Sequence, residues 1–256
     1  VIAHGLGEHS GRYGNVVERM LLKGISAFVP DHRGHGQSEG KRGHVLTFGQ
    51  YLSDLRLSVE LAGENRPEGM KLFLLGHSLG GLIVLNFAQQ FPDLIDGVVA
   101  SSPALGMAIE VAGVKKALAS LMSHIWPEMT MGNELDATKI SHDQKVVSAY
   151  KSDPLVHDRV SVRFFTEFLA AMETAHAKAS RLKVPTLLQV AGNDKLVNAP
   201  SSTQFFKKLE FKDITLLVYD GRYHEIYNEV EDLRRDVFKD LEDWLEKQLG
   251  MTIDER

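Results

Sequence analysis

Short apolar runs alternate with longer amphipathic stretches along this chain of 256 residues. The apolar runs predict strands over Val1–His4, Ile25–Pro30, Lys71–Leu75, Gly97–Ser101, Pro185–Ala191 and Ile214–Tyr219. Their continuous apolar character is typical of parallel strands that are covered on both faces. Helical patterns lie between them, at about Tyr13–Lys23, Thr47–Asn65, Leu79–Gln90, Ala199–Leu209 and Glu229–Leu249. This alternation predicts an α/β fold with a mostly parallel, doubly wound sheet, whose chemistry lies at the carboxyl ends of the strands.

One stretch, from about Leu105 to Ser180, contains no convincing strand. It holds helical patterns rich in Ala, Met and Phe, such as Val111–Trp126 and Val160–Ala179. We interpret residues 105–180 as a helical cap inserted after the sixth strand, above the active-site face of a core formed by residues 1–104 and 181–256. The alternative is a helical subdomain that only buries itself.

The first residues already read as a buried central strand that runs into a functional turn. We therefore expect one or two leading strands, and any signal segment with them, to be missing from this sequence.

The pattern G-x-S-x-G occurs twice, around Ser38 and around Ser78. A nucleophile elbow needs a strand before the serine and a helix after it, because this sharp turn lifts the hydroxyl off the backbone. Ser78 has the predicted strand Lys71–Leu75 before it and an apolar helical pattern after it. Ser38 has neither, since it lies in a loop dense in glycine, histidine and charge. Ser78 is therefore the predicted nucleophile, rather than an ordinary small residue of a turn.

Two backbone N–H groups are candidates for an oxyanion hole. The unpaired N–H groups and the positive dipole end of a helix stabilise a nearby oxyanion, which favours the N–H of Leu79. In this type of fold the turn after the first strand supplies a second donor. Leu6 is the best candidate there, because glycines on both sides let the backbone approach closely. His4, in the same turn, either contacts substrate or braces the loop through hydrogen bonds, and we favour bracing.

Chain order selects the base and the acid, since a G-x-S-x-G nucleophile is followed first by Asp or Glu and then by His. Asp194 lies in the turn after the predicted strand Pro185–Ala191, and His224 is the only histidine beyond it. A serine hydroxyl is a poor nucleophile until an imidazole takes its proton, and a carboxylate fixes the tautomer of that imidazole. Asp220 is the nearest competitor for the acid, but it is close to His224 along the chain and would have difficulty facing the ring.

Composition narrows the class of protein. The chain is 43% hydrophobic and 25% charged, as in ordinary globular enzymes. Its formal net charge of -5 argues against a nucleic-acid partner, and no apolar run is long enough to span a bilayer. The absence of cysteine excludes disulfides and thiolate metal sites. We expect a cytoplasmic or membrane-peripheral location.

The segment from Asp31 to His35 resembles a metal cluster, with two histidines and a carboxylate. A serine mechanism requires no metal, however, so we interpret this segment as a hydrogen-bonded loop and expect neither a metal nor a cofactor.

A stripe of apolar residues follows helical spacing in the first cap pattern: Val111, Val114, Leu118, Leu121, Met122 and Ile125. Such a stripe lines an acyl tunnel, packs on neighbouring helices or contacts a lipid surface. We favour packing together with tunnel lining. The alternative is transient contact of the cap with a membrane or micelle surface.

Four segments together resemble the monoacylglycerol lipase family of α/β-hydrolases. Residues 4–13 are similar to the HG-x-GEHSGRY signature of that family, and residues 31–40 to its D-x-x-GHGxSEG loop. Residues 76–81 match its GHS-x-GG elbow, and residues 150–155 resemble its Y-x-x-DPL segment. The elbow is shared with many hydrolases, whereas the first and last segments are more specific. The similarity extends over essentially the whole chain.

The resemblance implies hydrolysis of monoacylglycerols, a small lipid ester substrate, to a fatty acid and glycerol, with an acyl tunnel beneath the cap. It implies the triad Ser78, Asp194 and His224 and the oxyanion donors Leu6 and Leu79. It further places Glu8, Arg12 and Tyr150 at the polar end that accepts glycerol. Each of these three also has a structural interpretation, as a loop-shaping ion pair for Glu8 and Arg12 and as a core aromatic for Tyr150. A lysophospholipase, a general carboxylesterase and an aminopeptidase use the same scaffold, and a non-catalytic binding protein is a remote alternative.

Overall fold

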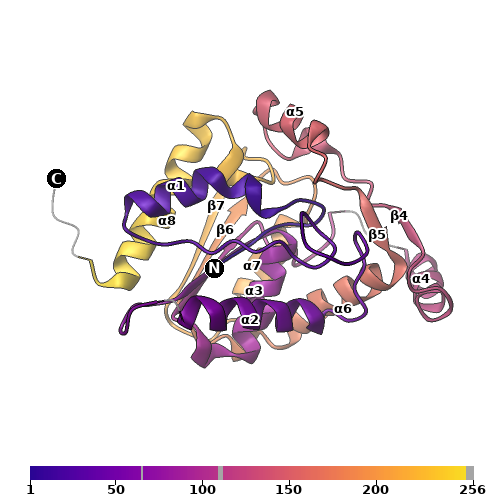
Figure 1. Cartoon of the computed structure of the whole chain (residues 1–256), viewed down its shortest axis with the longest axis horizontal. Helices are drawn as coiled ribbons and strands as arrows, with labels where there is room; N and C mark the ends of the chain where they lie inside the picture. The colour runs from indigo at the N-terminus through magenta and orange to yellow at the C-terminus, as the bar shows by residue number, and fades with distance from the viewer. Residues whose placement is uncertain (65, 109–111, 252–256) are drawn as a thin grey trace.

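This computed structural model describes residues 1–64, 66–108 and 112–251. A parallel sheet with the strand order β1-β2-β3-β6-β7 crosses the middle of the molecule (Figure 1). The strands are β1 (Ile2–Ala3), β2 (Phe73–His77), β3 (Gly97–Ser101), β6 (Thr186–Ala191) and β7 (Ile214–Tyr219). The parallel, doubly wound sheet that the apolar runs predict is thus confirmed.

The predicted strand Ile25–Pro30 is wrong. This segment runs along the edge of β1, but the only ladder contact that it makes in the described chain joins the Ile2 N–H to the Phe28 carbonyl at 2.8 Å. Ile25, Ala27 and Val29 pack against the core, while Phe28 between them is exposed. The apolar run therefore belongs to an extended edge segment that is buried on one side only, which is the situation that produces alternating exposure.

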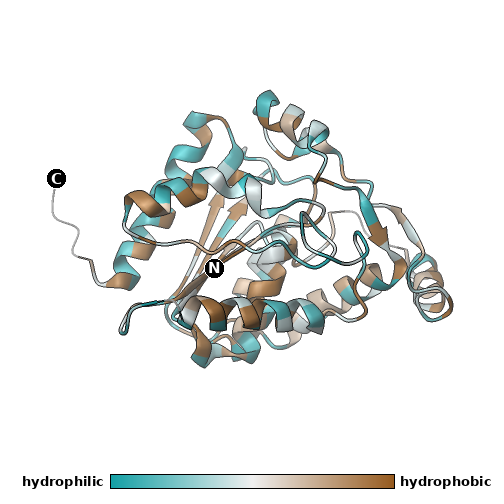
Figure 2. Cartoon of the chain, viewed as in Figure 1, coloured by the Kyte–Doolittle hydropathy of each residue, from teal (hydrophilic) through white to brown (hydrophobic). Residues whose placement is uncertain are grey.

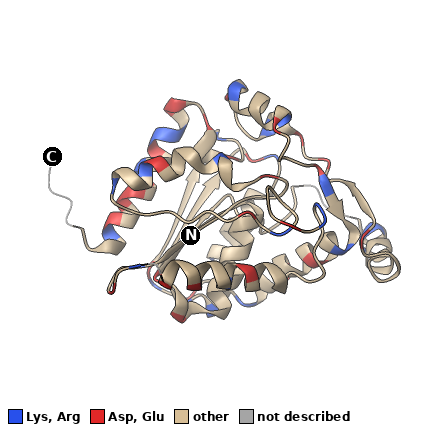
Figure 3. Cartoon of the chain, in the orientation of Figure 1, with Lys and Arg blue, Asp and Glu red and all other residues tan. Residues whose placement is uncertain are grey.

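Helices cover both faces of the sheet (Figure 1). The helices on one face are α1 (Gly14–Leu22) and α8 (Glu231–Leu249), and those on the other are α2 (Gly49–Glu64), α3 (Leu79–Gln90), α6 (Val162–Ala177) and α7 (Ala199–Phe206). Because successive strand residues point to opposite faces, Leu74 belongs to the core beneath α3 and Leu75 to the core beneath α8. The strands are accordingly hydrophobic (Figure 2), whereas charged side chains gather on the outer helices, α8 above all (Figure 3).

The insertion (residues 105–180) follows β3, which is the fourth of the predicted strands in chain order. It contains α4 (Gly113–Ile125), β4 (Thr130–Gly132), α5 (Gln144–Ser152), β5 (Arg159–Ser161) and α6. The expectation of an entirely helical insertion is wrong, since β4 and β5 pair as an antiparallel ribbon. Strands of three residues are too short to show an alternating pattern. Most of the insertion lies at the end of the molecule opposite the C-terminal helix (Figure 1).

Four residues of the predicted apolar stripe face outward on α4, and Met122 is partly buried. Exposed fractions are 82% for Val114, 59% for Leu118, 57% for Leu121 and 68% for Ile125, while Val111 lies outside the described residues. We favoured packing together with tunnel lining, and the packing is wrong for these four residues. The helix lies against α6 through another side, where the hydroxyls of Ser123 and Thr166 are 3.1 Å apart. Among the described residues, no helix is both long enough and apolar enough to cross a membrane.

Candidate active site

Ser78 occupies a strained turn between β2 and α3. Its backbone has φ 54° and ψ -115°, a conformation that costs a residue with a side chain on the order of 1–3 kcal/mol. The surroundings fix it, because the Ser78 N–H donates to the Ser101 carbonyl at 3.0 Å and the Ser78 carbonyl accepts from Leu82 and Ala104, each at 3.0 Å. The side chain remains partly exposed. This is the local geometry that the G-x-S-x-G pattern predicts for a nucleophile elbow.

The helix after Ser78 begins unusually close to the end of β1. A Cβ atom at Gly80 would lie 2.0 Å from the Ala3 carbonyl oxygen and 2.6 Å from that of His4. Only glycine allows this approach, which brings the start of α3 beside the turn that contains Leu6. Within the described chain, the N–H groups of Leu6 and Leu79 donate to no other atom. Both are therefore available to stabilise a developing oxyanion.

Asp194 and His224 form a buried pair. The Nδ1 atom of His224 lies 2.6 Å from Oδ2 of Asp194, and Oδ1 accepts the N–H groups of Leu196 at 2.8 Å and Val197 at 3.0 Å. Burial opposes ionisation of Asp194, but the interaction with His224 and the two backbone donors hold its pKa below the usual value. Burial also opposes protonation of His224, and the adjacent carboxylate overcomes this and raises the pKa of the imidazole. The pair is thus arranged to hold an imidazolium.

The three predicted triad residues follow the carboxyl ends of β2, β6 and β7, at one edge of the sheet. The ring of His224 lies 4.7 Å from the ring of His77, the residue that precedes Ser78. Burial and the nearby His224 lower the pKa of His77 to about 4, so that His77 is neutral at pH 7.

The two competing candidates lie elsewhere. The hydroxyl of Ser38 donates to the carbonyl of Asp31 at 2.7 Å, within its own loop. Asp220 is exposed and forms no hydrogen bond or ion pair with His224, whose partner is Asp194.

His4 braces the loop, as expected. It is fully buried, its Nε2 accepts the N–H of His32 at 2.9 Å and its Nδ1 donates to the carbonyl of Gly5 at 2.8 Å. Burial and neighbouring His35 lower the pKa of His4 to about 3. Asp31 accepts the backbone N–H groups of Ser10 and Gln37, each at 2.7 Å. The segment from Asp31 to His35 is therefore a hydrogen-bonded loop, which was the favoured interpretation.

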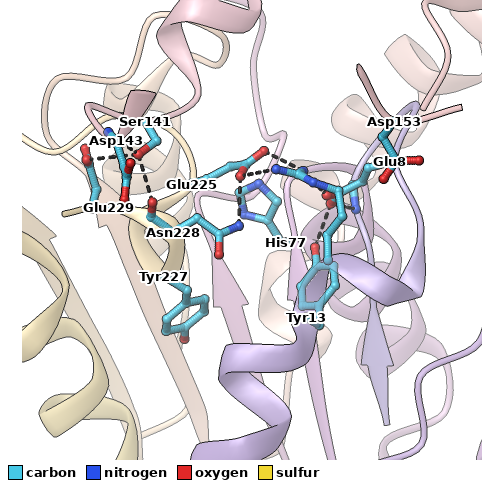
Figure 4. Close-up of polar contacts among 12 residues, drawn as sticks. Glu8, Tyr13, His77, Ser141, Asp143, Asp153, Glu225, Tyr227, Asn228 and Glu229 are labelled. Carbon is cyan, nitrogen blue, oxygen red and sulfur yellow. Dashed lines mark hydrogen bonds and ion pairs between the residues drawn. The ribbon is translucent and has the colours of Figure 1, made fainter. Parts of the chain in front are cut away.

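Glu8 and Arg12 form an ion pair, and a third residue completes it. The guanidinium of Arg12 donates to Glu8 and makes two parallel bonds of 2.7 Å to the carboxylate of Glu225. Glu8 also accepts the Gly5 N–H at 2.5 Å and the Tyr13 hydroxyl at 2.7 Å. Glu8 and Glu225 approach this cluster from separate segments of the chain (Figure 4). The contacts correspond to the loop-shaping interpretation of Glu8 and Arg12.

Tyr150, on α5, closes one side of this cluster. The guanidinium carbon of Arg12 lies 4.7 Å from the centre of its ring, which is a cation–π distance. The side chain is half-buried, and its hydroxyl has no hydrogen-bond partner among the described residues. Tyr150 is therefore not a core aromatic with a satisfied hydroxyl.

Sequence reasoning missed two buried carboxylates that follow His224 along the chain, Glu225 and Glu229. Glu229 accepts the backbone N–H of Tyr223 at 2.7 Å. From the insertion it also accepts the backbone N–H of His142 at 2.9 Å, and Nδ1 of the same histidine lies 2.8 Å from the carboxylate. The hydroxyl of Ser141 lies 3.3 Å from the same carboxylate, and Figure 4 shows Ser141 and Glu229 beside Glu225 and Asn228. No spacing rule marks either glutamate. The only available signal is that Glu225 directly follows the predicted base.

The chain is similar over most of its length to several known proteins. The family model described as serine aminopeptidase, S33 matches residues 1–231. A protein of Mycolicibacterium smegmatis named monoacylglycerol lipase is 33% identical over 250 residues, which cover 97% of this chain and 88% of that protein. Phospholipase YtpA of Bacillus subtilis is 33% identical over 241 residues, which cover 93% of this chain and 91% of that protein. The crystal structure of Paleococcus ferrophilus monoacylglycerol lipase matches with a TM-score of 0.89 and 38% identity, and covers 96% of this chain and 93% of that chain.

Proposed function

The chain belongs to the serine aminopeptidase S33 family of α/β-hydrolases, and from this premise we propose that it cleaves monoacylglycerols to a fatty acid and glycerol. It is a carboxylic ester hydrolase that acts on a lipid ester. The observation that carries the proposal is the buried Asp194–His224 pair at the same edge of the sheet as the strained Ser78, in a chain whose relatives include monoacylglycerol lipases from distant organisms.

The proposed reaction follows from the groups at this edge of the sheet. His224 accepts the proton of Ser78 as the hydroxyl attacks the ester carbonyl, and the N–H groups of Leu6 and Leu79 stabilise the oxyanion. Asp194 holds the imidazole in the required tautomer and stabilises the imidazolium. Glycerol leaves with a proton from His224, and a water molecule activated by the same imidazole then hydrolyses the acyl-enzyme. No step in this sequence requires a cofactor.

We place the polar end of the substrate at Tyr150. Its hydroxyl is without a protein partner, whereas the polar atoms of Glu8 are already engaged by Gly5, Arg12 and Tyr13. Glu8 and Arg12 thus form the wall against which the head group lies, and Tyr150 offers a hydrogen bond to a glycerol hydroxyl.

We further propose that the insertion is a cap above Ser78 and that the outward stripe of α4 contacts the lipid surface from which substrate enters. Four exposed apolar side chains on one helix favour an interfacial role, since a helix of this kind lies in the plane of a membrane interface. The protein then acts as a membrane-peripheral enzyme that takes its substrate from a membrane or micelle.

A lysophospholipid is the second candidate substrate, because one relative is named a phospholipase. Initial rates on 1-monooleoylglycerol, lysophosphatidylcholine and p-nitrophenyl butyrate separate the candidates. We expect monooleoylglycerol to be the best of the three, and the proposal fails if it is the poorest. Ser78→Ala should abolish hydrolysis and labelling by a fluorophosphonate probe. Persistent labelling of this variant would show that another residue is the nucleophile.

A further inference from the structure

The loop that carries His224 is joined to the oxyanion loop by a chain of buried charges. Glu8 is 4% exposed, Glu225 is 6% exposed and the Arg12 side chain between them is 10% exposed. Glu8 holds the N–H of Gly5, the residue before the oxyanion donor Leu6. Glu225 directly follows His224 in the sequence. One guanidinium thus connects the segment that supplies an oxyanion N–H to the segment that supplies the base.

The contacts between Arg12 and Glu225 fix direction as well as distance. Two parallel bonds of 2.7 Å hold the guanidinium and the carboxylate in one plane, and Asn228 donates a further bond of 2.8 Å to Glu225. The cavity lined by Glu8, Arg12, Glu225 and their neighbours has a volume of only about 10 Å³, which is room for one water molecule and not for a head group. This cavity is therefore too small for a glycerol head group, and the contacts on this side hold the members of the cluster in place.

The cluster also carries net charge. Two carboxylates face one guanidinium, so that one negative charge remains uncompensated near the imidazole. Burial disfavours the imidazolium of His224, and Asp194, Glu225 and Glu8 together raise its pKa. Within the described part of the chain, the titratable groups that act on His224 are these three carboxylates and the neutral His77, and the cation of Arg12 lies between Glu8 and Glu225.

We propose that Glu225 is a positioning residue, which keeps His224 in register with the oxyanion loop through Arg12 and Glu8 and adds negative charge beside the imidazolium that forms during acyl transfer. The proposal rests on the proposed function in one respect, that His224 is the base. Neither the sequence patterns nor the resemblance to lipases assigns a role to Glu225.

Glu225→Gln tests the proposal, because it keeps the shape of the side chain and removes its charge. We expect kcat on p-nitrophenyl butyrate to fall by at least about tenfold with KM changed less than twofold, since both carboxylate oxygens of Glu225 are already bonded to Arg12 or Asn228. The acidic limb of the profile of kcat/KM against pH should move to lower pH, because the imidazolium loses a stabilising charge. A residue with a merely structural role would leave that limb where it is.

The matched control is Glu231→Gln, the same change at an exposed glutamate that pairs with Arg234 at the start of α8. It should leave kcat and the pH profile unchanged. Unchanged kcat and an unchanged acidic limb in folded Glu225→Gln would overturn the proposal.

Arg12→Lys is the second variant, and it carries the test if Glu225→Gln does not fold. Lysine keeps the positive charge but lacks the planar fork that reaches both carboxylates. We expect kcat to fall at least fivefold, and activity equal to that of the parent would overturn the proposal. The failure of the proposed function is distinguishable, because it appears as poor hydrolysis of monooleoylglycerol or as labelling that persists in Ser78→Ala.

Discussion

Replacing Asp194 by asparagine separates the electrostatic role of this residue from its shape. In the parent, Oδ1 accepts two backbone N–H groups, from Leu196 and Val197, and Oδ2 faces Nδ1 of His224 at 2.6 Å. An amide NH₂ group cannot accept from backbone donors, so the oxygen of the new side chain must stay where Oδ1 is. Its nitrogen therefore faces His224. The imidazole must then accept at Nδ1 and carry its proton on Nε2, which is the wrong tautomer for a general base.

The expected magnitude follows from that tautomer. The same substitution in Ser-His-Asp triads lowers kcat by about 10⁴-fold, which corresponds to about 5.4 kcal/mol at 1.36 kcal/mol per decade. We expect a loss of this order in Asp194→Asn, with KM little changed. The melting temperature should change by a few degrees at most, because the two side chains have nearly the same volume.

The rate of p-nitrophenyl butyrate hydrolysis at pH 7 measures this effect. Labelling of Ser78 by a fluorophosphonate probe is a second measurement of it. Asp220→Asn is the matched control, since Asp220 is exposed and lies near His224 along the chain. It should retain parental activity. Activity of Asp194→Asn within tenfold of the parent would refute the assignment of Asp194 as the orienting acid, and a larger loss in Asp220→Asn would transfer the role to that residue.

Three further outcomes are expected. Gly80→Ala should lower the free energy of unfolding by about 2 kcal/mol or more and reduce kcat, because the new Cβ atom would lie 2.0 Å from a backbone oxygen. In the control Gly63→Ala the new Cβ atom would meet no atom within 4 Å, and this variant should be more stable than the parent. Equal stability of the two variants would contradict this reasoning. Burial and nearby His32 lower the pKa of His35 to about 3, so between pH 6.5 and 3 only the unfolded chain binds this proton and stability falls as pH falls. His35→Gln should reduce the slope of the unfolding free energy, measured by urea denaturation, against pH by about 1.4 kcal/mol per pH unit. An unchanged slope would exclude the effect. Leu118→Ser combined with Leu121→Ser should weaken sedimentation with phosphatidylcholine vesicles while hydrolysis of p-nitrophenyl butyrate stays constant, and parental sedimentation would argue against α4 as the lipid-contacting helix.

The strands and helices that build the sheet layers were predictable because each carries a strong periodic signal. α3 begins and ends at the residues expected from its pattern, Leu79–Gln90. The segment Ile25–Pro30 misled because a run of apolar residues reads the same in an edge segment and in a central strand. The ribbon of β4 and β5 could not be predicted, because three residues per strand are too few to show an alternating pattern.

The candidate site divides in the same way. Ser78, Asp194 and His224 were accessible from the sequence because each follows a strand and their order along the chain is constrained. Glu225 and Glu229 were not, since their partners, Arg12 and His142, are distant in sequence and ionic contacts leave no periodic trace. The outward orientation of the α4 stripe was equally hidden, because an amphipathic pattern defines a face and not what covers it.

Hydrogen bonds join the insertion to the sheet at positions that any exchange of the insertion would have to keep. The Ile140 carbonyl accepts the N–H of Glu225, and the His157 N–H donates to the Gly7 carbonyl, each at 2.8 Å. The carboxylate of Glu229 forms hydrogen bonds with Ser141 and His142 of the insertion. A chimera that exchanges the insertion for that of another hydrolase must therefore recreate these hydrogen bonds. Otherwise the loop that carries His224 loses part of its support. Grafts that preserve residues 140–142 and 157 should keep turnover, whereas grafts cut between them should fold but hydrolyse slowly.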